Sequence, residues 1–424
     1  MCVAALLQQK RLPEARRTEA RQALLSIFCL TVALVGASGL PGQVASQKIP
    51  EKGEQQTHGA QALPAHGGAE QYNNRGNSLL EQGKVDEAIA EFRNALEADP
   101  RCAAAYNNLG VAFRTKGNTQ LAIAQFQKAL ELDSKLAEAY NNLGLVFGQR
   151  HDFPAAEKYL HQALQLRPDY PEAYNNLGIN LTGQGRNAEA AEALRKAVQL
   201  QPDYAEAYSN LGLVLIRLGR FPEAGRELQR AVALDPNRAQ THYYVGLCLQ
   251  RTGQLKGAIG EFRKAEALNP DYPEALQALG HALRQAGETP EAEEVEQTVR
   301  KIEKAREDEK LAMAANNAGL LLMEKGDLNA AVARFRDAQK LAPNLAVVNG
   351  NLGAALLAAG DLQGAEEALK KASALEPNNP AGYFYLGLVM EKRGDHDAAL
   401  GEYRRALELN PEFIEAKKAL DRLH

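Results

Sequence analysis

Small and large apolar residues recur along this chain with a period of 34 residues. Glycines from Gly76 to Gly280 are separated by six intervals of this length, and three more glycines continue the spacing from residue 319. Most units then repeat an alanine, a large apolar residue and a second alanine at fixed offsets, as in Ala122, Phe126 and Ala129. Apolar residues three or four positions apart lie on one face of an α-helix. The pattern therefore predicts repeated helices rather than one compact core.

Each unit is predicted to contain two helices joined by a short polar turn. In the second unit the first helix covers residues 104–116, the turn is Gly117-Asn118 and the second helix covers residues 119–132. Glycine on the first helix and alanine on the second allow a close approach. A proline, which lacks the N–H that a helix interior needs, closes most units. One pair cannot bury its apolar faces alone, so the fold class is all-α, an α-solenoid of stacked pairs.

The regular spacing is interrupted once. Residues 69–303 hold seven units and residues 312–413 hold three, but the interval from Gly280 to Gly319 is 39 residues. The stretch 290–311 is dense in charge and predicts a long helix that acts as a spacer. Five additional residues rotate a helix by about 140° beyond whole turns, so we expect the last three units to be offset. Either a change of curvature or a hinge with its own docking face would fit. Residues 414–424 are predicted to form a capping helix.

The repeated string Tyr-Asn-Asn-Leu-Gly, at 106–110, 140–144 and 174–178, resembles the tetratricopeptide repeat when it is taken with the later Ala, large apolar, Ala and Pro positions. The resemblance covers about ten units over residues 69–413, with departures such as Arg75 in place of Leu and Ser134 in place of Pro. It implies a right-handed α-solenoid whose first helices line a concave surface. In the family that surface binds extended peptides or helices of other proteins.

An asparagine stands two residues before the glycine in seven of the units: Asn74, Asn108, Asn142, Asn176, Asn210, Asn317 and Asn351. The spacing places these residues above one another, and an amide both donates and accepts hydrogen bonds. They are therefore candidate peptide-binding residues, similar to the asparagine ladder of O-linked N-acetylglucosamine transferases. The alternative is a structural role between neighbouring units. Tyr244 and Ala278 interrupt the row, so the surface should change character there.

Residues 1–45 have the layout of an export signal. Five basic residues precede an apolar run at 23–35, and small residues follow at 36–39. A retained membrane anchor over residues 22–40 is the alternative. We expect a periplasmic, secreted or membrane-anchored protein. Residues 46–68 are predicted to be a disordered linker, and His58 and His66 within it do not make a metal-ligand set.

Composition narrows the classes of function. The chain has 49 Lys and Arg against 53 Asp and Glu, so a nucleic-acid partner is not expected. Four cysteines among 424 residues do not make a disulfide scaffold. Motifs for phosphate binding, zinc hydrolysis or a nucleophilic serine are missing, so we expect no enzyme activity, cofactor, metal or small-molecule substrate. His151 and His161 are expected at the surface, and the glycosylation triplet at Asn180 falls on a helix.

Two functions fit these features. The first is a non-catalytic scaffold that binds other proteins or peptides on the exported side of a membrane. The second is a regulatory or substrate-recruiting subunit of an enzyme system, such as a glycosyltransferase or a polysaccharide-export complex. Its catalytic domain would lie on a partner, because about 100 unassigned residues would be needed here.

Overall fold

The computed structural model describes residues 65–423, which form 20 helices and no strand. The helices up to the interruption are α3 (Ala65–Glu81), α4 (Val85–Ala98), α5 (Ala103–Thr115), α6 (Thr119–Leu132), α7 (Ala137–Gln149), α8 (Phe153–Leu166), α9 (Pro171–Gly183), α10 (Asn187–Leu200), α11 (Ala205–Arg217), α12 (Phe221–Leu234), α13 (Ala239–Arg251), α14 (Leu255–Leu268) and α15 (Pro273–Ala286). They are followed by α16 (Thr289–Glu324), α17 (Leu328–Leu341), α18 (Ala346–Ala359), α19 (Leu362–Leu375), α20 (Pro380–Arg393), α21 (His396–Leu409) and α22 (Ile414–Leu423).

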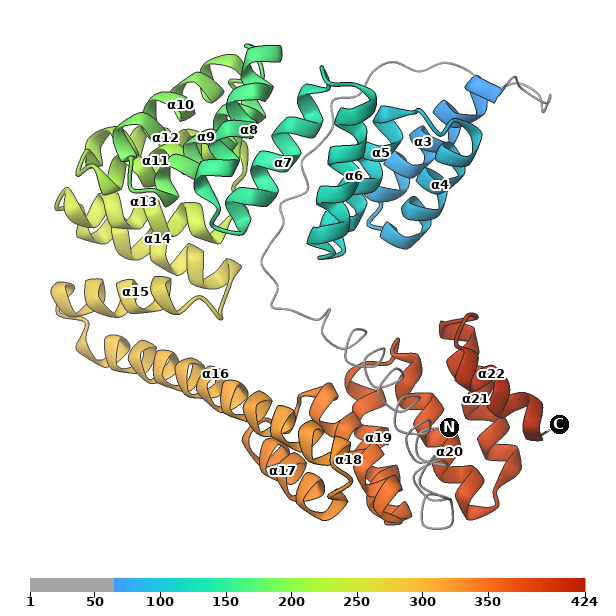
Figure 1. Ribbon diagram of the computed structural model, residues 1–424. Helices are drawn as coiled ribbons and strands as arrows, with labels where there is room; N and C mark the ends of the chain where they lie inside the picture. The colour runs from blue at the N-terminus through green and yellow to red at the C-terminus, as the bar shows by residue number, and fades with distance from the viewer. Residues whose placement is uncertain (1–64, 424) are drawn as a thin grey trace. The chain divides into compact units, whose positions relative to one another are not determined.

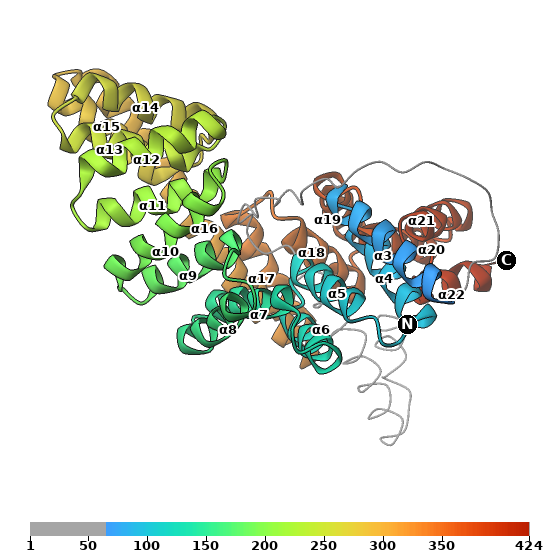
Figure 2. The ribbon, with the colours of Figure 1, turned by 90° about the horizontal axis from the view of Figure 1, so that it is seen from above.

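The helices pack as consecutive pairs, which confirms the predicted all-α solenoid (Figure 1). In the pairs from α3 and α4 to α13 and α14, and again in α18 and α19 and in α20 and α21, the two helices pack along each other. The second helices from α4 to α14 also pack on the first helix of the next pair. Successive first helices, such as α9 and α11, touch directly to a greater extent than successive second helices do. The first helices therefore line the inner side of the stack, and the same order of pairs is visible after a quarter turn (Figure 2).

Contacts divide the chain into two compact units within α16, between Val299 and Arg300. The first described array runs from α3 to the start of α16. The second contains the remainder of α16, the helices up to α21 and the terminal α22. Ala416 and Ala419 of α22 are buried against α21, where they close the apolar end of the second array. Each array is thus built from the same paired element.

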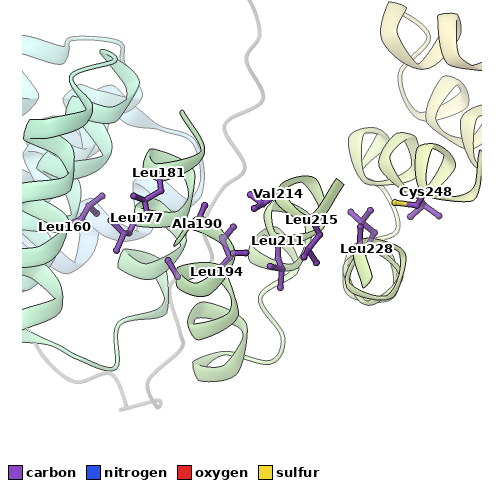
Figure 3. Close-up of a cluster of buried hydrophobic side chains, with 14 residues drawn as sticks. Leu160, Leu177, Leu181, Ala190, Leu194, Leu211, Val214, Leu215, Leu228 and Cys248 are labelled. Carbon is purple, nitrogen blue, oxygen red and sulfur yellow. The ribbon is translucent and has the colours of Figure 1, made fainter. Parts of the chain in front are cut away.

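The core of each pair lies where a glycine of the first helix meets a large side chain of the second. A Cβ atom at Gly110 would lie 2.6 Å from the Phe126 ring, and one at Gly178 would lie 2.5 Å from Cγ of Leu194. Both large side chains are fully buried. Figure 3 shows Leu194 among the leucines of neighbouring pairs. The predicted close approach of the helices is confirmed.

The turn inside most pairs contains a glycine with a positive φ, such as Gly185 at 77°. In the third pair His151 takes this place with φ of 60°, the only non-glycine residue of the described chain in that region. Left-handed backbone is costly for residues with a Cβ atom, which explains why the other pairs use glycine. His151 and His161 are both exposed, as predicted.

Two boundaries differ from the sequence predictions. α3 begins at Ala65, so residues 65–68, which we predicted to be disordered linker, are helical; Ala69 is buried and anchors this first turn. The predicted long helix at 290–311 is also only part of α16, which continues through the first helix of the eighth pair. No glycine or proline stands between Pro290 and Gly319 to stop it.

Candidate functional site

The seven first helices α3 to α15 form one continuous surface, which we call the first-helix surface. Five of the candidate asparagines, from Asn74 to Asn210, lie on it, and the amides of four of them are used inside the array. The Nδ2 atoms of Asn108, Asn142, Asn176 and Asn210 each donate to Oδ1 of an asparagine 35 residues earlier, at 2.9 to 3.0 Å. The accepting residues are Asn73, Asn107, Asn141 and Asn175. Each bond joins one pair of helices to the next.

The second array repeats this arrangement. Asn351 of α18 donates to Oδ1 of Asn316 in α16 at 2.9 Å. Asn74 and Asn317 are the first members of their rows and are exposed, and neither has a hydrogen bond to another side chain of the described residues. The structure thus brings five of the seven candidates into inter-unit bonds and leaves two without them.

The accepting asparagines were not recognised from the sequence, although they are the first Asn of the repeated Asn-Asn string. Asn107, Asn141 and Asn175 are at most 7% exposed. Beside Asn141, the Tyr170 hydroxyl has a raised pKa, because it is buried and lies near the Glu172 and Glu138 carboxylates. The side-chain oxygen of each of these buried asparagines accepts from the next pair of helices, so this row stabilises the stack.

An aliphatic row lies one helical turn beyond the asparagines on the same helices. It consists of Val111, Leu145, Ile179, Leu213 and Leu247. Apolar neighbours such as Leu177 and Leu211 are buried between pairs, whereas the members of this row stay partly exposed, and Ile179 is 42% exposed. The first-helix surface therefore presents apolar area that the array itself does not cover.

The row of asparagines ends at α11, and the surface changes there. Between α13 and α15 lies an open hollow of about 460 Å³, lined by residues that include Tyr243, Leu247, Glu274 and His281. Tyr243 packs on Tyr272, with ring centroids 5.3 Å apart, and also on Phe262 and Tyr244. Burial raises the pKa of the Tyr243 and Tyr272 hydroxyls.

The other residues with candidate chemistry lie apart from one another. Burial raises the pKa of the Cys248 thiol to about 11, so this cysteine behaves as an apolar core residue. Asn180 of the glycosylation triplet is 3% exposed within α9 and donates to the Phe153 carbonyl, so it is not an acceptor for a sugar. Among residues 65–423 no group of three or more His, Cys, Asp or Glu side chains is placed to hold a metal ion.

Models of known families match nearly the whole chain. The model described as the cilia and flagella-associated protein 70 C-terminal domain matches residues 3–272. Models described as tetratricopeptide repeats match residues 246–309, 314–345 and 351–412. The chain belongs to the tetratricopeptide repeat family, through the repeat domain that these models describe. No curated protein sequence matches it.

Several solved tetratricopeptide repeat structures are similar to parts of this chain. PilF of Pseudomonas aeruginosa is 23% identical and covers 50% of this chain and 96% of its own, with a TM-score of 0.46. YrrB, described as having an unusual peptide-binding site, is 27% identical and covers 44% of this chain and 96% of its own, with a TM-score of 0.37. MamA of Desulfovibrio magneticus RS-1 is 26% identical over 39% and 94%, with a TM-score of 0.37.

The predicted export signal and most of the predicted linker come before the residues that the structure describes. The predicted signal or anchor at 1–45, including the apolar segment 22–40, and most of the linker with His58 lie outside the described residues. Over residues 65–423, none of the helices combines the length and apolarity needed to cross a bilayer.

A structural role for the asparagine pairs leads to a stability prediction. Asn176→Ala should lower the free energy of unfolding by about 1–2 kcal/mol, because Oδ1 of the buried Asn141 loses its donor. Asn74→Ala should have almost no effect, because Asn74 is exposed and has no such partner. Urea unfolding followed by circular dichroism measures both variants. Equal stability of the two would show that the inter-unit bonds contribute nothing.

Proposed function

We propose that this protein is a non-catalytic scaffold that binds partner polypeptides on its first-helix surface. The observation that carries the proposal is the aliphatic row from Val111 to Leu247, which recurs every 34 residues and remains partly exposed. Exposed apolar area that repeats in register on one face favours an elongated partner over a small molecule. The hollow between α13 and α15 offers a place for a larger side chain at one end of that row.

The proposal includes a location on the exported side of a membrane. It is supported by the basic start of the chain, the apolar run at 23–35 and the small residues after it. Cell fractionation with N-terminal sequencing of the purified protein tests this part. A mature N-terminus near residue 45 indicates cleavage of a signal, whereas an intact N-terminus in the membrane fraction indicates an anchor. An intact protein in the cytoplasmic fraction contradicts export.

Binding is tested with two matched substitutions. Ile179 lies in the aliphatic row at 42% exposure, and Leu166 lies at the end of the second helix α8 at 41% exposure. The full chain carrying Ile179→Glu should lose captured partners in affinity purification with mass spectrometry, because the new charge would have to be buried under the partner. The Leu166→Glu chain should retain them. The same partners on both variants would place binding away from the first-helix surface.

A further inference from the structure

We infer that the first-helix surface from α7 to α15 recognises a basic, extended polypeptide segment, and that it does so with hydrogen-bond acceptors and carboxylates. This inference rests on the proposed function and adds the chemical class of the partner. It follows from the direction of the asparagine pairs, from glutamates in the same register, and from the aliphatic row beside them.

The asparagine pairs leave oxygen atoms for a ligand. In each pair the donating Nδ2 atom is already used inside the array, while Oδ1 of Asn142, Asn176 and Asn210 receives no donor from the described residues. Asn176 is the clearest case, since it is only 6% exposed and its Oδ1 atom has no protein partner. The Oδ1 atom of Asn176 is nevertheless accessible to solvent. An acceptor held in this way accepts from water in the free protein and is available to an N–H group of a partner.

Glutamates repeat in register with these oxygen atoms. Glu138, Glu172 and Glu206 each lie four residues before an asparagine of the row, which is one helical turn away on the same face. Glu274 has the equivalent position in α15 and lines the hollow. Glu138 pairs with Arg167, but Glu172, Glu206 and Glu274 form no ion pair with any described residue. The first turn of a helix tolerates a carboxylate, yet the array supplies no counterion for these three.

Basic side chains at the other end of the first helices are already engaged. Arg217 donates to the carbonyl oxygen of Thr182 at 3.4 Å, and the guanidinium of Arg251 lies 5.8 Å from the centre of the Phe221 ring. An acidic partner along the asparagine row would meet the glutamates before it met these arginines. Charge complementarity along the row therefore favours Lys and Arg in the partner.

These three rows define one kind of occupant. An extended segment presents backbone N–H groups to the asparagine oxygens, while its side chains alternate in direction. Basic side chains reach Glu172 and Glu206, and aliphatic side chains pack on Ile179 and Leu213. A segment that alternates Lys or Arg with aliphatic residues satisfies all three rows at once.

The experiment compares three fluorescent peptides of equal length that alternate leucine with lysine, glutamate or glutamine. Fluorescence anisotropy measures their binding to the full chain over a range of salt concentrations. The lysine peptide should bind best and weaken as salt rises. The double variant Glu172→Gln/Glu206→Gln should weaken it at least about threefold and flatten its salt dependence. The control Glu192→Gln/Glu227→Gln removes the same charge from the second helices α10 and α12 and should leave binding unchanged.

The outcomes separate this inference from the proposed function. If the glutamate or glutamine peptide binds as tightly as the lysine peptide and Ile179→Glu abolishes that binding, the basic preference is wrong while the binding surface stands. If both double variants weaken the lysine peptide equally, its attraction is nonspecific and the inference is wrong. If no peptide binds, the inference is also wrong; capture of the same partners by the Ile179→Glu chain would then overturn the proposed function as well.

Discussion

Gly178→Val is expected to lower the free energy of unfolding by about 3 kcal/mol. The new Cβ atom would lie 2.5 Å from Cγ of Leu194 and within 3.1 Å of both its methyl groups. Leu194 is completely buried among neighbouring leucines, so it has no free volume into which to move. The α9 and α10 helices must separate, and the adjacent pairs lose contact with them. Urea unfolding followed by circular dichroism gives the size of the loss.

Gly260→Val is the matched control. Gly260 also lies within a helix, α14, but no atom lies within 4 Å of the position that its Cβ would occupy. Valine has a higher helix propensity than glycine, so this variant should be as stable as the parent or slightly more stable. A similar loss at both positions would mean that valine destabilises these helices wherever it is placed, and that the close approach of α9 to α10 does not explain the glycine at 178.

The fold was predictable because its determinants lie within single units. The spacing of Gly110, Ala122 and Phe126 predicts which residues meet across one helix pair. In the structure Gly110 lies against Phe126, and both Ala122 and Phe126 are buried. The fusion of two helices into α16 was missed although the signal was present. The absence of glycine and proline between residues 291 and 318 favours one uninterrupted helix, whereas the repeat spacing suggested two.

The candidate site was predictable only in part, because it depends on contacts between units. The string Asn-Asn identifies two rows of amides, but the sequence does not say which row lies between the helices and which faces outward. The structure shows that Asn141 is buried and accepts from Asn176, a relation between residues 35 positions apart. The direction of this bond decides what the surface offers a ligand, and it follows from packing rather than from residue type.

A buried histidine was missed for a related reason. His242 of α13 stands where earlier units have Tyr, so the periodic pattern gives it no special role. Its Nε2 atom lies 2.9 Å from the Pro236 carbonyl oxygen, and its Nδ1 atom lies 2.6 Å from Oε2 of Glu261 in α14. Burial alone would raise the pKa of Glu261, but hydrogen bonds from His242 and Lys264 outweigh burial and lower it. The Glu261 carboxylate is therefore charged, and it lies within hydrogen-bond distance of the His242 ring.

His242→Ala is expected to lower the free energy of unfolding by about 3 kcal/mol, because it opens a cavity and leaves the Pro236 carbonyl and the Glu261 carboxylate without their donor. Because folding lowers the pKa of Glu261, the charged carboxylate stabilises the fold at pH values above its unfolded pKa of about 4.3. This stabilisation is lost as pH falls through the folded pKa. The stability gap between the parent and the variant should therefore narrow in acid. Urea unfolding at neutral and acidic pH measures the gap.

His161→Ala is the matched control for this prediction. His161 also faces a carboxylate, with 3.7 Å between its Nε2 atom and Oε1 of Glu157, but its side chain is 56% exposed. Exposed pairs contribute little because water screens them, so this variant should unfold as the parent does at every pH. A gap for His242→Ala that stays constant from neutral to acidic pH would show that the cavity, and not the charged hydrogen bond, accounts for the loss. Narrowing of the gap would identify the Glu261 carboxylate as the group that ties α14 to α13.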